Sequence, residues 1–322
     1  PEDSAGSIMT TEYVELRPHM TVEEAIKHLR RSGINKETIN TCYISAKDRK
    51  LIGLVTIRDL IMADSDDVLE DIMDEKPISV TTMEDQEHVA QQFTRYDLLA
   101  MPVVDGEDRL VGIVTVDDVL DVMQEEVTED IEKMAAIVPA DKPYLKLSTF
   151  ELWKSRIPWL LLLMISATFT GMIITRFEDA LSKVVILTAY IPMLMDTGGN
   201  SGSQASVTVI RGISLGDVEF SDLLKVIWKE VRVAMAIGMT LACCNMLKLM
   251  IFDHLDLQVA LVVCLTLLVT VFCAKLVGCT LPLFAFKLGF DPAVMASPFI
   301  TTIVDAVSLL VYFQFATRLL GI

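Results

Sequence analysis

Residues 192–206 read PMLMDTGGNSGSQAS and continue the apolar run VVILTAYIPMLM (184–195). In a soluble protein, this content of Gly, Asn and Ser would indicate a turn. At membrane depth, non-helical backbone is tolerated only where protein buries it or where it lines a watery cavity. We expect broken backbone beside an aqueous path, because glycines permit close approach and amides offer oxygen ligands. The alternative is a loop just outside the bilayer, since Arg211 is near.

Apolar segments lie on both sides of this stretch. IPWLLLLMISATFTGMIIT (157–175) carries no charge and is long enough for one span. The short run 184–195 and ASVTVI (205–210) form a second, interrupted span. Lys275 interrupts a later apolar run, where it is expected to snorkel or to pair. The other three candidate spans, which complete an all-α transmembrane domain of five helices, are 233–252, 257–286 and 292–317.

Basic residues indicate the orientation of these spans. Seven of them fall on the side where residues 1–150 lie, whereas the opposite loops hold Arg176 and Lys183. Since cytoplasmic loops carry an excess of Lys and Arg, we expect residues 1–150 in the cytoplasm, below a plasma membrane, and the C-terminus outside. The seven are Lys154, Arg156, Arg211, Lys225, Lys229, Arg232 and Lys287.

The two halves of the chain differ in charge. Residues 1–142 hold 32 Asp and Glu against 14 Lys and Arg, whereas residues 143–322 hold 12 against 13. So acidic a half does not suit nucleic-acid phosphates, which favour basic surfaces, and it suits cations. Five of the six cysteines lie beyond residue 240 and none forms a CxxC pair, so neither a zinc site nor a disulfide framework is predicted.

The acidic half contains an internal repeat. KLIGLVTIRDLIMAD (50–64) matches RLVGIVTVDDVLDVM (109–123), which places Gly53 and Gly112 at equivalent positions, 59 residues apart. The segments that precede these, 9–33 and 73–97, also match. Each unit is predicted to run strand, helix, strand, strand, helix.

The repeated G-x-x-T-x-x-D element resembles a tandem pair of cystathionine-β-synthase (CBS) domains, over about residues 8–125. We expect an α+β cytosolic pair with boundaries at 1–65 and 66–125. The resemblance implies that the Thr and Asp of each element contact the phosphate and ribose of an adenine nucleotide such as ATP, and helix N-termini do favour phosphate. The alternative is that they only cap helices. The residues concerned are Thr56, Asp59, Thr115 and Asp118.

Asp305 is the most unusual residue of the apolar half, because it lies inside ITTIVDAVSLL. A carboxylate at the centre of a membrane helix costs about 2.5–3.5 kcal/mol on insertion scales, so it is a candidate for function. Alternatively, it is a polar contact between helices, or it is kept protonated. Ser297, Thr301 and Thr302 lie one or two turns upstream and form a polar stripe. Asp291 lies at the cytoplasmic mouth of the span.

Three motifs together resemble the MgtE family of magnesium channels: P-x-L-x-D-T-G-G-N-S-G-S-Q-A-S (192–206), D-P-A (291–293) and P-F-I-T-T-x-x-D (298–305). The resemblance extends over almost the whole chain. It implies a homodimer whose pore follows the two-fold axis, where paired Asp305 carboxylates hold a hydrated Mg²⁺. The family often has Asn where this chain has Ser297. The implied pore-lining residues are Asp305, Gly198, Gly199, Asn200, Ser297 and Thr301.

Family members usually carry an acidic N-terminal helical domain, which this sequence does not contain. The sequence begins at Pro1 without an initiator Met, and we expect it to be a truncated chain. Gating by Mg²⁺ in this chain is therefore expected to differ from that of a full-length member.

Acidic residues between 117 and 132 predict gating by Mg²⁺. This run contains no basic residue, and we expect a connecting helix over 126–150. By resemblance, Mg²⁺ bridges these carboxylates and closes the pore, and ATP pre-orders the closed state. A solvated helix face is the alternative for this run and for a second acidic run at 64–75. The implied regulatory ligands are Asp85, Glu87, Asp97, Asp118, Asp121, Glu126, Glu129, Asp130 and Asp291.

Two other functions fit some of these features. Asp196 and Asp305 could form an intramembrane aspartyl protease dyad, but the G-x-G-D element of such enzymes does not occur here. A CBS-regulated transporter of another ion, in particular another divalent cation, is the second alternative. An anion carrier would instead place basic groups or helix N-termini at depth. We therefore predict a Mg²⁺ channel or transporter, not an enzyme.

Overall fold

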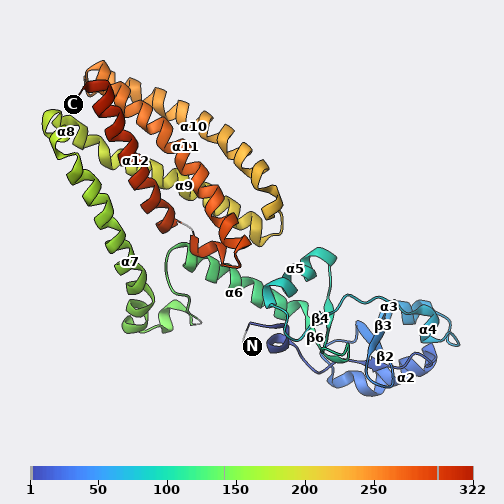
Figure 1. Cartoon of the computed structure of the whole chain (residues 1–322). Coiled ribbons are helices and arrows are strands. Elements are labelled where there is room, and N and C mark those ends of the chain that lie inside the picture. Colours follow the sequence, from blue (N-terminus) through green and yellow to red (C-terminus); the bar gives the residue numbers. More distant parts are fainter. Residues whose placement is uncertain (1–2, 141, 296, 322) are drawn as a thin grey trace. The chain divides into compact units, whose positions relative to one another are not determined.

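The computed structural model describes residues 3–140, 142–295 and 297–321. It divides into two compact units, Pro1–Val127 and Thr128–Ile322. Figure 1 shows strands in the first unit and long helices in the second. Helix α6 (Val116–Met134) runs from one unit into the other.

The N-terminal unit contains two three-stranded sheets with the same topology. In each sheet the first strand pairs parallel with the second, and the second pairs antiparallel with the third. The strands are β1 (Glu15–Leu16), β2 (Thr41–Ser45), β3 (Leu51–Thr56), β4 (Val80–Thr81), β5 (Ala100–Val104) and β6 (Leu110–Thr115). The helices are α1 (Ala5–Ile8), α2 (Val22–Ser32), α3 (Ile57–Met62), α4 (Leu69–Ile72) and α5 (Gln86–Tyr96).

The repeat seen in the sequence extends to irregularities of the sheets. The register of β2 against β3 shifts between Ile44 and Ser45, and that of β5 against β6 shifts between Val103 and Val104. These positions are 59 residues apart, like the repeat itself. A bulge at the same place in both halves bends both sheets alike, so the halves share their detailed geometry as well as their topology.

The repeated glycines interlock the two halves. A Cβ on Gly53 would lie 2.6 Å from Sδ of Met73, and a Cβ on Gly112 would lie 2.8 Å from Sδ of Met9. Because real Cβ atoms essentially never come this close, each glycine admits the opening segment of the other half. Isolated antiparallel bridges beside these contacts join the same segments: Leu54 with Asp74, and Ile113 with Thr10.

The second unit is helical. In the described residues, five long helices follow α6, and a short helix, α8 (Glu178–Lys183), lies between the first two. The long helices are α7 (Thr149–Arg176), α9 (Ile191–Ser214), α10 (Leu223–Ile251), α11 (Leu257–Lys287) and α12 (Ser297–Leu320). These two units confirm the predicted class, an α+β pair followed by an all-α domain.

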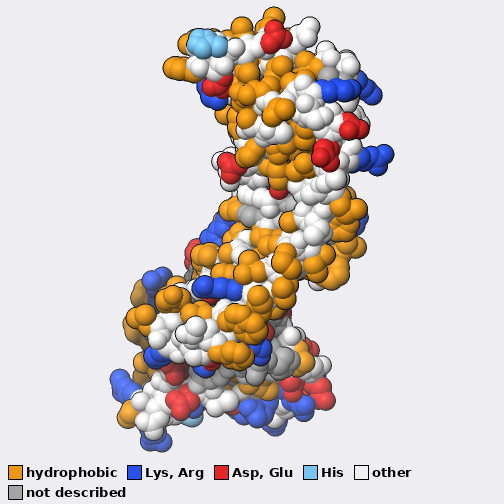
Figure 2. Space-filling model, turned by 90° about the vertical axis from the view of Figure 1, so that its left-hand side faces the viewer, with side chains coloured by type: hydrophobic (Ala, Val, Ile, Leu, Met, Phe, Trp, Pro, Cys, Tyr) orange, Lys and Arg blue, Asp and Glu red, His pale blue; other side chains and the backbone are white. Residues whose placement is uncertain are grey.

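Four of the described helical segments are long and apolar enough to cross a membrane, by length and composition alone: Thr149–Arg176, Phe220–Ile251, Leu257–Lys287 and Pro292–Leu320. Orange apolar side chains spread over much of the visible face of this unit in Figure 2. Helix α7 is the least buried of the four, and many of its large apolar residues are exposed.

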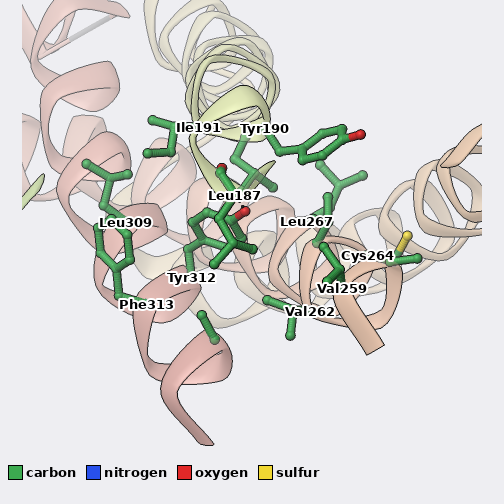
Figure 3. Packing of buried hydrophobic residues seen from close by; sticks show 14 of the residues in the cluster. Leu187, Tyr190, Ile191, Val259, Val262, Cys264, Leu267, Leu309, Tyr312 and Phe313 are labelled. Carbon is green, nitrogen blue, oxygen red and sulfur yellow. Dashed lines mark hydrogen bonds between the residues drawn. The ribbon is translucent and has the colours of Figure 1, made fainter. Parts of the chain in front are cut away.

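The largest buried cluster among the described residues of the helical unit is built mainly from the start of α9, α11 and α12, and it also includes Leu181 of α8 and Leu249 of α10. Leu187, Tyr190 and Ile191 come from the start of α9 and the turn before it, and they pack against residues of α11 and α12 (Figure 3). The hydroxyl of Tyr312 donates a hydrogen bond to the carbonyl of Leu187 at 2.9 Å. This bond satisfies a buried carbonyl where the turn leads into α9.

The expectation of broken backbone in residues 197–206 is wrong, because α9 is a continuous helix through this stretch. Its small residues serve close packing instead. Gly198, Gly202 and Ser206 recur every fourth residue and are buried. A Cβ on Gly202 would lie 2.5 Å from Cγ2 of Ile300, so only glycine allows α9 and α12 to approach this closely. Stripes of small residues are a common basis of helix packing in membranes.

The connecting segment also differs from its expected extent of 126–150. Helix α6 begins at Val116 and ends at Met134, and the next long helix starts at Thr149. Ala136 has a φ of 55°, a left-handed conformation that often follows the end of a helix. Pro139 and Pro143 then lack the amide hydrogen that a continuing helix requires.

Candidate ion site and regulatory sites

Asp305 lies in the first half of α12 and is half-exposed. Within the part of the chain that the structure describes, no hydrogen bond or ion pair joins its carboxylate to another residue. Asp196 of α9 is the charged residue that acts on it electrostatically. The carboxylate is therefore available to a cation and is not neutralised by a basic side chain.

The threonines of the polar stripe upstream of Asp305 form hydrogen bonds within their own helix. The hydroxyls of Thr301 and Thr302 both donate to the carbonyl of Pro298, at 2.9 and 3.1 Å. Such bonds satisfy the hydroxyl donor and leave the oxygen lone pairs free to accept. Ser297 is the first residue of α12, and its side chain lies outside the described residues.

The glycine motif lies against this part of α12. A Cβ on Gly199 would lie 2.8 Å from Cγ2 of Thr301, and one on Gly198 would lie 2.8 Å from Cγ1 of Val304. Both glycines are buried, whereas Asn200 is exposed. The structure thus brings the two glycines of α9 to the turn of α12 just before Asp305, and it leaves the Asn200 amide at the protomer surface.

Among the described residues, no group of three or more His, Cys, Asp and Glu is arranged to hold a metal ion. Buried hydroxyls without a hydrogen-bond partner do occur in the helical unit, on Ser201, Ser206 and Thr270. The two serines belong to the quoted motif, but sequence reasoning interpreted them only as part of a polar stretch.

Lys275 is paired. Its Nζ lies 3.8 Å from Oε2 of Glu230 on α10, and both side chains are largely buried. The structure therefore favours pairing over snorkelling. The sequence did not identify Glu230 as the partner, because the two residues are 45 positions apart on different helices.

The C-terminal part of α6 packs against the last turns of α9 and against the residues just before α12, all within the same unit. Met134 packs with Ile210 and Ala293. The hydroxyl of Ser214, at the end of α9, donates to Oδ2 of Asp130 at 3.3 Å. The expected regulatory residues of this unit are therefore placed where a connecting helix meets the ends of two bundle helices.

Lys133 occupies the centre of this contact. Its Nζ lies 2.6 Å from Oδ2 of Asp291 and 2.5 Å from Oε1 of Glu129. The other oxygen of Asp291 accepts a hydrogen bond from the amide of Ala293 at 2.8 Å. A side-chain ammonium thus bridges two of the carboxylates that the sequence assigned to metal regulation.

The electrostatics of this cluster distinguish its members. Burial raises the pKa of Asp130, and the nearby carboxylate of Asp291 raises it further. Burial alone would lower the pKa of Lys133, but its hydrogen bonds to Asp291 and Glu129 outweigh burial, so the pKa is raised. Lys133 is therefore a firmly held cation, and Asp130 is a carboxylate whose charge is poorly compensated.

The other expected regulatory acids belong to the N-terminal unit. Oδ1 of Asp85 accepts from the amide of Glu87 at 2.9 Å, so this pair begins α5. Asp97 ends the same helix with a φ of 52°. The side-chain Nε2 of Gln86 donates to Oε1 of Glu126 at 2.9 Å. These residues have local structural partners, and the described structure does not gather them into one site.

The two expected nucleotide positions differ in their surroundings. Thr115 donates to Oδ2 of Asp118 at 2.7 Å, and Asp118 lines an open cleft of about 370 Å³. The equivalent pair, Thr56 and Asp59, forms a capping box at the start of α3, and Asp59 is exposed. The cleft is also lined by Ser7, Ile8, Met9, Thr10, Glu37, Asp121, Val122 and Glu125.

Every charged residue on this cleft is acidic: Glu37, Asp118, Asp121 and Glu125. Sequence reasoning missed Glu37 and the N-terminal segment 7–10. The repeat does indicate that residues 7–10 matter, because Met9 is equivalent to Met73, which opens the second repeat unit.

An acidic unit of two CBS-like repeats, followed by apolar helices with an uncompensated carboxylate, indicates a cation transport protein of membranes that carries CBS domains. Comparisons with known proteins agree. The MgtE family profile, described as a divalent cation transporter, matches residues 191–315, and the CBS domain profile matches residues 5–66 and 69–125. The chain belongs to the MgtE family.

Two curated relatives carry this assignment. The magnesium transporter MgtE of Thermus thermophilus is 41% identical over 319 residues, which are 99% of this chain and 70% of that protein. The magnesium transporter MgtE of Bacillus subtilis is 38% identical over 323 residues, with 98% and 70% covered. These relatives are transporters and not enzymes, so the protease alternative does not apply.

Solved structures resemble the N-terminal part. A structure of the cytosolic domain of the Mg²⁺ channel MgtE in complex with ATP is 50% identical and has a TM-score of 0.38. The match covers 38% of this chain and 49% of that one, so this chain spans about half the length of that structure.

Proposed function

We propose that this protein is a Mg²⁺ channel or transporter of the plasma membrane, in which the ion passes Asp305 on the two-fold axis of a homodimer. The observation that carries the proposal is the Asp305 carboxylate, which lies in an apolar helix without an ion-pair partner among the described residues. A charge in such a place is costly, and a passing cation lowers the cost. Membership of a family of magnesium transporters agrees with this role.

Two-fold symmetry would bring two Asp305 carboxylates to one site. Mg²⁺ gives up its waters reluctantly, so a hydrated ion held through water suits two carboxylates better than direct coordination by one chain. Another divalent cation is the alternative cargo. The remaining residues of the proposed path are Gly198, Gly199, Asn200, Ser297 and Thr301, most of them contributing backbone.

In the proposed gating, Mg²⁺ in the cytoplasm closes the pore. CBS domains 1–65 and 66–125 sense the ion on the cytoplasmic side, the connecting segment 126–150 transmits the signal, and residues 151–322 conduct. The repulsion between Asp130 and Asp291 supports this idea, because a dication there would relieve it. The proposed regulatory ligands are Asp85, Glu87, Asp97, Asp118, Asp121, Glu126, Glu129, Asp130 and Asp291.

ATP binding is a further part of the proposal. The nucleotide would contact Thr56, Asp59, Thr115 and Asp118 and stabilise the closed arrangement. The cleft beside Asp118 supports a ligand there. Because all charged residues on this cleft are acidic, a triphosphate would need to enter with its counter-cation.

The pore assignment is tested by Mg²⁺ flux into liposomes that contain the purified chain. Asp305→Asn keeps the size of the side chain and removes its charge, so we expect flux to fall by at least tenfold while the protein remains folded. Asp217→Asn, in the loop after α9, is the matched control and should conduct normally. Normal flux through Asp305→Asn would refute the assignment.

A further inference from the structure

Asp196 is a carboxylate of α9 that is not part of the proposed pathway. It is the sixth residue of α9 and is exposed on the protomer. The described residues offer it no hydrogen bond or ion pair. Asp196 and Asp305 are thus both carboxylates without a partner, and they belong to two helices that pack together.

Contacts along these helices show that α9 and α12 run antiparallel. The turn before α9 meets α12 where Tyr312 bonds to Leu187. Further along α9, Gly199 faces Thr301. Residue numbers rise along α9 as they fall along α12, which fixes the direction of the pair.

The contact between Gly199 and Thr301 locates the two carboxylates relative to each other. On an α-helix, residues three or four apart lie on the same face, one turn away. Asp196 precedes Gly199 by three positions, and Asp305 follows Thr301 by four. In an antiparallel pair these two steps lead in the same direction, so both carboxylates flank the same seam one turn beyond the contact. The electrostatic interaction between Asp196 and Asp305 agrees with this placement.

We propose that Asp196 is a second acidic residue of the ion site and that it sets the affinity for Mg²⁺ and the preference for divalent over monovalent cations. This inference rests on the proposed function of Asp305. In a homodimer the site would then be faced by four carboxylates. A hydrated dication offsets their mutual repulsion more fully than a monovalent ion can, because the attraction scales with the charge of the ion.

The test is Asp196→Asn in the otherwise intact chain, reconstituted in liposomes. We expect the Mg²⁺ concentration for half-maximal flux to rise about three- to tenfold, because one unit charge near the ion is lost. The flux of Na⁺ relative to Mg²⁺ should rise by a similar factor. Maximal Mg²⁺ flux should stay within about twofold, since Asp305 is retained. Asp196→Glu keeps the charge and should keep the half-saturation near the native value.

Two further variants separate the possible failures. Asp179→Asn, an exposed residue of the neighbouring α8, removes a charge on a different helix and should change neither quantity. Asp196→Ser replaces Asp196→Asn should the latter fail to fold, and the same shifts are expected. An unchanged half-saturation and Na⁺ flux in either variant, while Asp305→Asn abolishes flux, overturns the role of Asp196 alone. Normal flux through Asp305→Asn overturns the proposed function first.

Discussion

The crossing of α9 and α11 gives the sharpest structural prediction. A Cβ placed on Gly278 of α11 would lie 2.2 Å from the carbonyl oxygen of Gly202 and 3.0 Å from its carbonyl carbon. Ordinary van der Waals contact begins at 3.4 Å. The obstacle is backbone, which cannot rotate aside as a side chain can, so Gly278→Ala must separate the helices by about 1.2 Å, the difference between 3.4 and 2.2 Å.

The expected cost follows from two opposing effects. Overpacking a well-packed site costs about 1–3 kcal/mol, and a backbone obstacle places Gly278→Ala at the upper end. Alanine is the better helix former by about 1 kcal/mol. The net destabilisation is therefore about 2 kcal/mol. Mg²⁺ flux should fall as well, because a displaced α9 moves its glycines away from the turn before Asp305.

The assay is thermal unfolding of the detergent-solubilised chain, with flux in liposomes as the second measurement. Gly238→Ala is the matched control. Gly238 is also a buried helical glycine, but its added Cβ would meet atoms of Leu268 at 3.5–3.6 Å, which is ordinary contact. The control should be as stable as the native chain or slightly more so. Equal stability of Gly278→Ala and Gly238→Ala would show that the helices do not cross this closely.

Three other predictions concern regulation. Glu129→Gln combined with Asp130→Asn should raise the cytoplasmic Mg²⁺ concentration needed for closure severalfold in single-channel recordings. Unchanged inhibition would count against these ligands. Lys133→Met should increase opening at low Mg²⁺, because it removes a partly exposed ion pair worth about 1 kcal/mol. Thr115→Ala should weaken ATP binding to the whole chain about fivefold in calorimetry, since the loss of one hydrogen bond orienting Asp118 costs about 1 kcal/mol. Thr56→Ala is the comparison for the other half, and full affinity in both variants would exclude this nucleotide site.

The sequence was most informative where a pattern repeats. The equivalent glycines Gly53 and Gly112 predicted two copies of one unit, and the structure repeats even the bulge. It was misleading at residues 197–206, because Gly, Asn and Ser favour turns locally while tertiary packing decides otherwise. The spacing of Gly198, Gly202 and Ser206 at every fourth position was the available signal for a helix that packs closely.

Pairings between distant residues could not be predicted from the sequence. The acidic run ends at Glu132, one residue before Lys133, and nothing in the run indicates that the Lys133 ammonium bridges Glu129 and Asp291. Its partner Asp291 lies 158 residues away. Only the folded chain shows that a built-in cation already sits among the carboxylates proposed to bind a dissolved one.

The reciprocal fit of Gly53 with Met73 and of Gly112 with Met9 has a consequence for the N-terminal unit. Each half has a glycine beside which the opening segment of the other half packs, so neither half buries this surface by itself. Cleavage after residue 65 would expose both of these contact surfaces, and we expect the two fragments to associate through them and not to behave as independent domains. Because each half fills a close contact of the other, we expect the two halves to be stable only as a pair.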